Sequence, residues 1–316
     1  MDATDGLAAL LAGPRARGAF LLRTVFDPPF AVRIRDEAPL TVLTMARGTA
    51  WIVPDDGPPA AIGPGDAALV RGPEPYTVAD HPHTPVQAVV HPGQHSTDPG
   101  GAPLCAELDL GGRSWGVRAD GAAALLSGTY QLGGEISGRL LRALPPVAVL
   151  PADAWSSPLP ALLDEELDRD SPGQEAVLDR LLDLLLITVL REWFARPDAA
   201  APGWYRAYGD PVVGRVLRLL HGRPAEPWTV AALAAEAGVS RAALARRFTE
   251  LVGEPPMAYL TGLRLELAAD LLEAPEATLA GVARRVGYGS PFALSAAFKR
   301  VRGVSPQEHR EHGAHG

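Results

Sequence analysis

The chain has only one cysteine and one lysine among its 316 residues. Because the single cysteine, Cys105, cannot form an intrachain disulfide, a disulfide-stapled secreted scaffold is excluded. The first residues lack the basic-then-apolar pattern of a signal peptide. The longest apolar run, around Leu181–Leu190, is too short and too closely flanked by charge to span a bilayer. We therefore expect a cytoplasmic protein with no membrane contact.

Positive charge is also scarce, and it is unevenly distributed. The formal net charge is -8, but residues 210–316 hold 13 Lys and Arg against 11 Asp and Glu, a balance of +2. Residues 1–209 hold the remaining 16 basic against 26 acidic residues, a balance of -10. The length predicts two domains, and phosphate contacts with a nucleic acid would fall in the C-terminal one.

The N-terminal part predicts β-structure followed by helices. Residues 18–92 are short apolar or alternating runs separated by Pro-, Gly- and Asp-rich turns, which predicts a small antiparallel barrel or sandwich. Two helices then open with Ser-Pro, at Ser157 and Ser171. The second helix is apolar on several sides, so it is expected either to be buried in its own domain or to form a dimer interface, and the two are compatible. Its apolar positions are Val177, Leu181, Leu184, Leu185, Val189 and Trp193. Residues 196–210 are typical of a linker.

The last hundred residues carry two helix-turn-helix patterns in tandem. They run from Thr229 to Gly253 and from Thr278 to Gly303, with Gly238 and Gly287 at the turns. In each, a serine opens a second helix of the kind that enters a DNA major groove. A connecting helix of roughly 18 residues, about 27 Å long, is predicted between them.

The first recognition helix has Ser240 as its expected N-cap, and the helix start also favours a phosphate. Leu244, Phe248, Leu251 and Val252 form the core-facing stripe. Arg246 lies one turn after the cap, where its guanidinium can reach guanine O6 and N7. Phosphate contact or plain solvation of Arg246 is the alternative. The outward residues expected to contact DNA are Arg241, Ala242, Ala245, Arg246 and Thr249.

The second recognition helix has Ser290 as its cap and Pro291 in its first turn, with Leu294, Phe298 and Val301 facing the core. Its outward side offers no bidentate base reader, although apolar groups can contact thymine methyls. Lys299, Arg300 and Arg302 are expected to contact phosphates. The candidates for facing the groove are Pro291, Phe292, Ser295, Ala296 and Lys299. A capping box, Ser305 to Glu308, predicts a final helix.

Residues 210–312 closely resemble the DNA-binding domain of the AraC/XylS family of transcription regulators. The motifs WTVAALAAEAGVSRAAL, RRF, GEPPMAYL, VARRVGYGSPFALSAAFKR and GVSP appear in order at that family's spacing. The chain departs from the family at Ala296, where many members carry arginine. This departure leaves the second unit without its strongest expected base reader.

Residues 18–92 resemble the cupin sensor domain of many AraC-like proteins. Gly63-Pro64-Gly65-Asp66 matches a turn before a cupin strand, but Tyr76 stands where metal cupins often carry histidine. The earlier strand offers only Thr41 and Thr44 in place of the His-x-His and glutamate ligands, so we expect no catalytic metal and no cofactor. A small effector inside the barrel is expected to meet some of Arg33, Arg35, Trp51 and Tyr76.

One cluster offers an alternative. Five residues within a loop-like stretch are of the types that bind zinc, although loop histidines are usually solvated: His81, His83, His91, His95 and Cys105. If a metal is bound there, it should be structural or regulatory.

These patterns together predict an α+β protein with three parts. Residues 1–195 form a cupin-like β-barrel with a helical pair, 196–210 a linker, and 211–316 an all-α tandem helix-turn-helix domain. The expected function is sequence-specific binding of double-stranded DNA by a homodimeric transcription regulator under control of a small effector. RNA polymerase becomes a partner if the protein activates. The alternatives are a metal-dependent cupin enzyme with a DNA-binding tail, or an alkyl-transfer repair protein, for which one lone cysteine is a poor basis.

Overall fold

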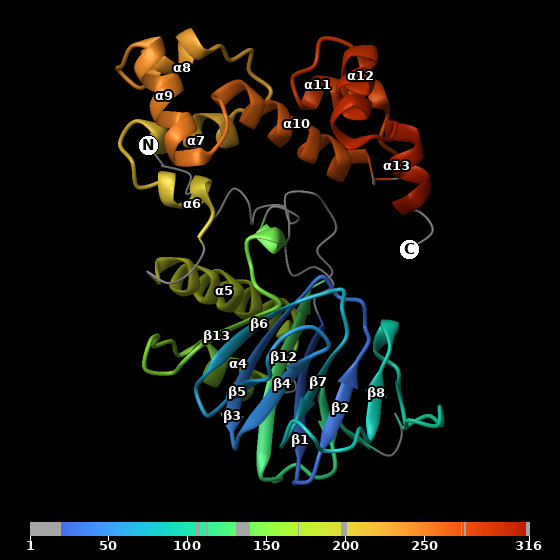
Figure 1. Ribbon diagram of the computed structural model, residues 1–316. Coiled ribbons are helices and arrows are strands. Elements are labelled where there is room, and N and C mark those ends of the chain that lie inside the picture. Colours follow the sequence, from blue (N-terminus) through green and yellow to red (C-terminus); the bar gives the residue numbers. More distant parts are fainter. Residues whose placement is uncertain are drawn as a thin grey trace. The chain divides into compact units, whose positions relative to one another are not determined.

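The chain forms two compact units. The computed structural model describes residues 20–104, 108–111, 113–130, 140–169, 171–196, 201–272, 274 and 276–313. One unit includes residues 15–132 and 144–200, and the other includes residues 201–316. Strands dominate the first unit and helices form the second (Figure 1), which confirms the predicted α+β class.

The strands of the first unit form two sheets. The seven-stranded sheet has the order β10-β11-β1-β12-β3-β6-β13, and the six-stranded sheet has the order β5-β4-β7-β2-β8-β9. The strands are β1 (Phe20–Phe26), β2 (Ala31–Ile34), β3 (Leu40–Arg47), β4 (Ala50–Pro54), β5 (Ala60–Ile62), β6 (Ala67–Arg71), β7 (Tyr76–Ala79), β8 (Ala88–Val90), β9 (Ser96–Thr97), β10 (Asp109–Gly111), β11 (Ser114–Gly116), β12 (Ala123–Tyr130) and β13 (Val147–Leu150).

Where the sequence predicts a barrel, the structure has two separate sheets. Each described strand pairs only within its own sheet, so no ladder closes them into a barrel. Apolar side chains of both sheets form one core, to which Leu43 and Leu125 contribute from one sheet and Ile52 and Val78 from the other. The Pro- and Gly-rich turns that end these short strands were visible in the sequence, but sheet closure depends on pairings between distant strands, which periodicity does not encode.

Two helices cover the outer face of the seven-stranded sheet, α4 (Leu159–Leu167) and α5 (Gln174–Ala195). Because of this cover, β3 is buried on both faces from Leu40 to Met45. α5 lies so close to β12 that a Cβ on Gly128 would come within 2.3 Å of Leu182 Cδ1. The helix starts at Gln174, later than the predicted Ser171-Pro172, because Gly173 takes the left-handed conformation at its cap.

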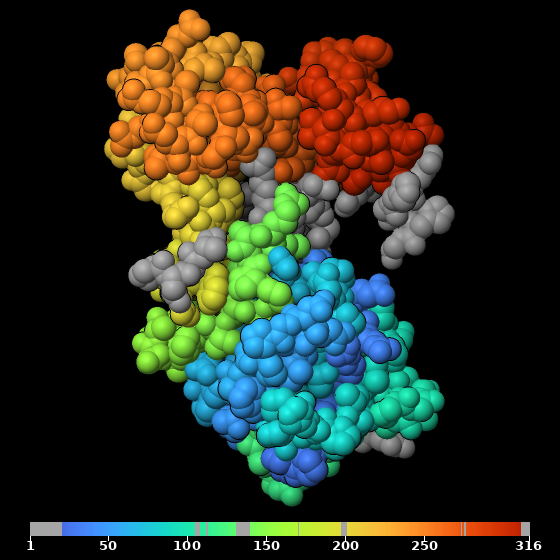
Figure 2. Space-filling model, in the orientation of Figure 1, coloured from blue at the N-terminus to red at the C-terminus, as the bar shows by residue number. Residues whose placement is uncertain are grey.

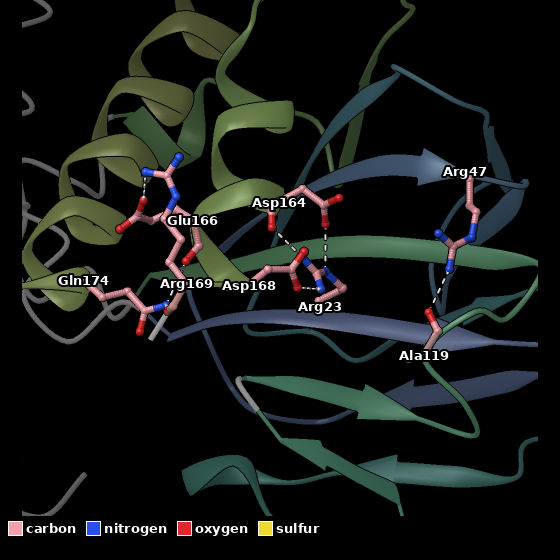
Figure 3. A network of polar contacts seen from close by, with 8 residues as sticks. All are labelled: Arg23, Arg47, Ala119, Asp164, Glu166, Asp168, Arg169 and Gln174. Carbon is pink, nitrogen blue, oxygen red and sulfur yellow. Dashed lines mark hydrogen bonds and ion pairs between the residues drawn. The ribbon is translucent and has the colours of Figure 1, made fainter. Parts of the chain in front are cut away.

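Ion pairs attach α4 to the sheet beneath it (Figure 3). Arg23 of β1 donates to Asp164 at 2.7 Å and to Asp168 at 2.6 Å, with its own side chain only 15% exposed. Burial alone would lower the pKa of Arg23, but hydrogen bonds and charge from these two carboxylates raise it. On the same sheet, Arg47 donates to the carbonyl of Ala119 at 3.1 Å.

The second unit is built on one long helix shared by two cores. Tyr259, Leu260 and Leu263 of α10 lie in the first core, and Leu265, Ala268 and Leu272 of the same helix lie in the second. Figure 2 shows the corresponding lobes, orange and red. The helices are α6 (Gly203–Ala207), α7 (Val213–Gly222), α8 (Val230–Glu236), α9 (Arg241–Val252), α10 (Pro256–Leu272), α11 (Leu279–Arg285), α12 (Pro291–Arg302) and α13 (Pro306–Gly313).

Part of the range expected to be a linker packs into this unit. Residues 203–207 form α6, and Trp204 is buried in the first core beside α9. Gly203 is so close to α9 that a Cβ there would come within 2.6 Å of the Leu251 carbonyl. Composition suggested a linker because small residues and prolines surround the few apolar residues that pack into this core.

Candidate functional sites

The two helix-turn-helix units repeat each other with an offset of 50 residues along their second helices. Ser240 accepts a hydrogen bond from the Ala243 N–H at 3.2 Å, and Ser290 accepts one from the Ala293 N–H at 3.1 Å. Both helices end at a left-handed glycine, Gly253 in α9 and Gly303 in α12. The predicted caps and boundaries are therefore confirmed, as is the Ser305–Glu308 capping box.

The core stripes differ from the prediction in their last turn. Leu251 is 38% exposed and Val301, its equivalent 50 residues on, is 55% exposed. The half-buried positions are one residue later in each helix, at Val252 and Arg302. Arg302 stacks its guanidinium over the Phe298 ring at 4.9 Å, and burial lowers its pKa. Arg302, expected at a phosphate, therefore packs on its own domain.

The outward side of α9 carries a largely exposed arginine, Arg246. The Arg246 side chain is 76% exposed, and its ion pair is with Glu250 at 3.8 Å. Its neighbour Arg247 instead makes a two-pronged contact with Asp210, with distances of 2.6 and 2.9 Å to Oδ2. Arg241, Ala242 and Thr249 are exposed and Ala245 is half-buried, all on the outward side.

The outward side of α12 is apolar at its start and basic at its end. Phe292 is 83% exposed, whereas the other phenylalanines whose burial the structure describes are all buried. At the 50-residue offset, Phe292 replaces Ala242 and Ala296 replaces Arg246. Pro291, Ala296, Lys299 and Arg300 are exposed, and Ser290 and Ser295 are half-buried.

Two exposed arginines were missed by the sequence analysis. Arg284 and Arg285 occupy the last turn of α11, and neither forms an ion pair within the described ranges. They add positive charge beside α12, in the same helix-turn-helix unit. Their place after the apolar Val282 and Ala283 is the signal that could have found them, since it puts both arginines off the buried face.

The turn of the second helix-turn-helix unit packs closely against the first helix-turn-helix unit. Gly287 has a φ of 81°, and a Cβ there would come within 2.5 Å of the Ala225 carbonyl oxygen. Gly238 takes the same kind of conformation, with a φ of 69°, but nothing lies within 4 Å of its Cβ position. Only glycine meets both demands at 287, because other residues strain at positive φ and lack the room.

The strand-rich unit contains a cavity of about 60 Å³ between its sheets. One strand runs along it with alternate residues, Phe30, Val32, Ile34 and Asp36. Most of the remaining wall is apolar, with Phe26, Met45, Trp115 and Leu125 among the lining residues.

Of the four residues expected to meet an effector, Tyr76 lines this cavity. Arg33 and Arg35 alternate with the lining residues of β2 and so belong to its opposite face, where Arg33 donates to Asp55 at 2.5 Å. Trp51 is likewise next to the lining residue Ala50. The sequence could not settle which parity faced inward, and these three residues do not line the cavity. Burial raises the pKa of Tyr76 above its ordinary value.

The histidines do not gather into a metal site in the part of the chain that the structure describes, where no group of three His, Cys, Asp or Glu could hold an ion. His81, His83 and His95 are exposed, and His91 pairs its Nε2 with Thr97 Oγ1 at 3.0 Å. Cys105 lies outside the described residues.

Comparison with known proteins decides the family. A cupin profile matches residues 5–195 and a helix-turn-helix domain profile matches residues 233–312. A putative AraC-like transcription regulator of Streptomyces lividans is 36% identical over 314 residues, covering 96% of this chain and 93% of that relative. Another from Streptomyces antibioticus is 34% identical over 323 residues, with the same two coverages. The chain belongs to the AraC-like transcription regulators.

As an AraC-like regulator, the chain is a DNA-binding transcription factor and not an enzyme, so the metal-dependent cupin alternative is not favoured. The chain is also similar to a solved structure of the DNA-binding domain of AdpA in complex with a target DNA. The two are 36% identical, the match covers 33% of this chain and 93% of the AdpA domain, and the TM-score is 0.31. Within the described ranges, no helix has the length and apolarity needed to cross a bilayer.

Proposed function

We propose that this regulator reads DNA with unequal recognition helices, α9 for guanine and α12 for thymine, and does so as a cytoplasmic homodimer under effector control. The observation that carries the proposal is the exchange at equivalent positions, Arg246 against Ala296 and Ala242 against Phe292. An exposed guanidinium matches the O6 and N7 acceptors of guanine, and an exposed phenyl ring matches the thymine methyl.

The phosphate contacts are assigned to side chains and helix ends around these readers. Lys299, Arg300 and Arg241 are exposed, and long cations at such places replace condensed counterions on the duplex. Ser240, Thr249, Ser290, Pro291 and Ser295 complete the surface that meets the backbone and groove edges. RNA polymerase joins as a partner if the regulator activates.

A thymine-to-uracil exchange tests the α12 assignment. Uracil lacks only the 5-methyl group, so losing its burial against Phe292 should cost about 0.8 kcal/mol, roughly a fourfold weaker complex. Binding would be measured by fluorescence anisotropy on a site selected from random DNA, with uracil placed at each thymine in turn. One position should respond in the wild type and not in Phe292→Ala, while Val301→Ala serves as the matched exposed control. Equal responses in all three proteins would refute the assignment.

The dimer interface is assigned to α5. Val177 is 43% exposed and Leu184 is 50% exposed, and with half-buried Leu181 they follow the i, i+4, i+7 spacing of one helix side. Analytical ultracentrifugation of the whole chain should show a dimer that Leu184→Glu dissociates. Val117→Glu, which alters an exposed valine elsewhere in the same unit, should leave it intact. A wild-type monomer at micromolar concentration would disprove the assignment.

The effector site is assigned to the cavity between the sheets, which has a mostly apolar wall and a few polar groups. The binding of a small molecule there should change the affinity of the chain for DNA. Ala50→Leu would fill part of the cavity and should remove this response while leaving DNA affinity without effector unchanged.

A further inference from the structure

A buried carboxyl group interrupts an otherwise apolar strip of the cavity wall. Phe30, Val32, Ile34 and Asp36 are alternate residues facing it, and the first three are apolar. Asp36 is only 8% exposed. A carboxylate in such a place loses hydration, so a packed core alone gives no reason for this residue type.

Several polar lining groups lie at the Asp36 end, whereas Thr24 pairs with Trp115 at the other end. The register pairs Ile34 with Tyr76 on one side and with Val90 on the other, which brings the start of β7 and the chain after β8 beside Asp36. A side-chain hydrogen bond joins Asp36 to Gln94, and another joins Tyr76 to Thr41. The opposite end is aromatic: Phe26 stacks on Phe30 and meets Trp115 edge-on, each with ring centroids 5.4 Å apart.

Asp36 lacks a cationic partner within the described residues. Its carboxylate accepts a hydrogen bond from the Ala38 N–H at 3.2 Å, and its other contacts are its own N–H and the Gln94 amide. The charged neighbours are Arg35 and Glu37, both exposed, while Arg33 is paired with Asp55. Burial raises the pKa of Asp36 above its ordinary value, and the hydrogen bonds from Ala38, its own N–H and Gln94 offset this only in part.

We propose that the cavity binds a small apolar molecule whose single polar group donates hydrogen bonds, an amine or an alcohol, and that Asp36 selects this group. The proposal rests on the effector site proposed above. A donor head at the Asp36 end supplies the missing partner, and the apolar body lies among Phe26, Phe30 and Trp115. A carboxylate head is rejected, because it would place a second negative charge beside Asp36.

The cavity volume limits the ligand to a few heavy atoms. At roughly 10–15 Å³ for each water-sized group, its 60 Å³ holds about four to six heavy atoms. A four-carbon chain is therefore a suitable probe length. n-Butylamine, 1-butanol and butyrate share this chain and differ only in the polar head.

Ligand-observed NMR on the whole chain at neutral pH tests the selection. We expect butylamine and butanol to bind at least about tenfold more tightly than butyrate. Asp36→Asn should reduce the amine-to-butyrate ratio towards one, whereas Asp55→Asn, which removes an exposed carboxylate of the same unit, should keep the wild-type ratio. A competition arm between butylamine and butanol identifies which donor is preferred.

Butyrate binding as tightly as butylamine in the wild type would overturn the proposal, whether or not the Asp36 variant folds. So would an unchanged ratio in a folded Asp36→Asn protein, with folding checked by circular dichroism. Butyl probes that fail to bind a chain that still binds DNA would refute the ligand class and leave the regulator function standing. Loss of salt-dependent DNA binding itself would refute the proposed function instead.

Discussion

Arg246→Ala is the most informative perturbation of the DNA interface. The side chain is 76% exposed and its ion pair with Glu250 spans 3.8 Å, so its removal should cost less than about 0.5 kcal/mol of folding stability. A bidentate contact to guanine is worth about 1–3 kcal/mol of discrimination, which corresponds to roughly 5- to 150-fold in affinity. The expected loss on DNA thus exceeds any loss from folding.

Fluorescence anisotropy over a salt series distinguishes base reading from phosphate contact. Arg246→Ala should weaken binding to the preferred site and remove the preference at one base pair. Arg246→Lys keeps the charge but not the planar fork, so it should lose most of that preference while keeping the salt dependence. Lys299→Ala should weaken all sequences alike and reduce the slope of log affinity against log salt by about one. If Arg246→Ala weakened matched and mismatched sites equally, the base-reading role would be refuted.

Three further predictions follow from the helical unit. Gly287→Ala should destabilise it by about 1 kcal/mol or more beyond Gly238→Ala in urea unfolding, because both residues have positive φ but only Gly287 lies against the backbone of Ala225; equal losses would contradict the close contact. A fragment that begins at residue 201 should have a free energy of unfolding about 3 kcal/mol higher than one that begins at residue 210, since the shorter fragment lacks buried Trp204. Equal urea midpoints for the two fragments would exclude α6 from the folded unit. Burial raises the pKa of Asp210, but hydrogen bonds from Arg247 and the N–H groups of Val213 and Val212 outweigh this and lower it. The stability from this lowered pKa is present above the ordinary value near 3.8 and is lost as pH falls through the lowered one, so Asp210→Asn should flatten the acid limb of the unfolding profile.

The helical unit was far more predictable than the strand-rich one. Caps such as Ser240 and Ser290 act within a few residues, so their chemistry can be read directly from sequence. Trp204 escaped notice because its burial depends on α9, which lies more than 30 residues away in the chain. The short stretch around Trp204 carries no periodicity that would predict a helix.

The lining of the cavity between the sheets was predicted only in part, for a different reason. Alternation in AVRIRD shows that Val32, Ile34 and Asp36 share one face of a strand, but not which face is inside. Choosing the arginines put the wrong parity inward. The stronger signal for the inward face was Asp36, the acidic residue that ends the apolar alternation, because a buried carboxyl group requires a hydrogen-bonding or charged partner.

The shared helix α10 also restricts the operators that this regulator can use. Its 17 residues span about 25 Å, and side chains of α10 are buried in both cores. The helix therefore fixes the distance and the rotation between α9 and α12. One added base pair would move the second contact by about 3.4 Å and turn it by roughly 35° around the duplex. An operator with an insertion between the proposed guanine and thymine contacts should therefore be bound by one protomer through one recognition helix alone. In the proposed homodimer, variable spacing among promoters would then have to arise between the two half-sites.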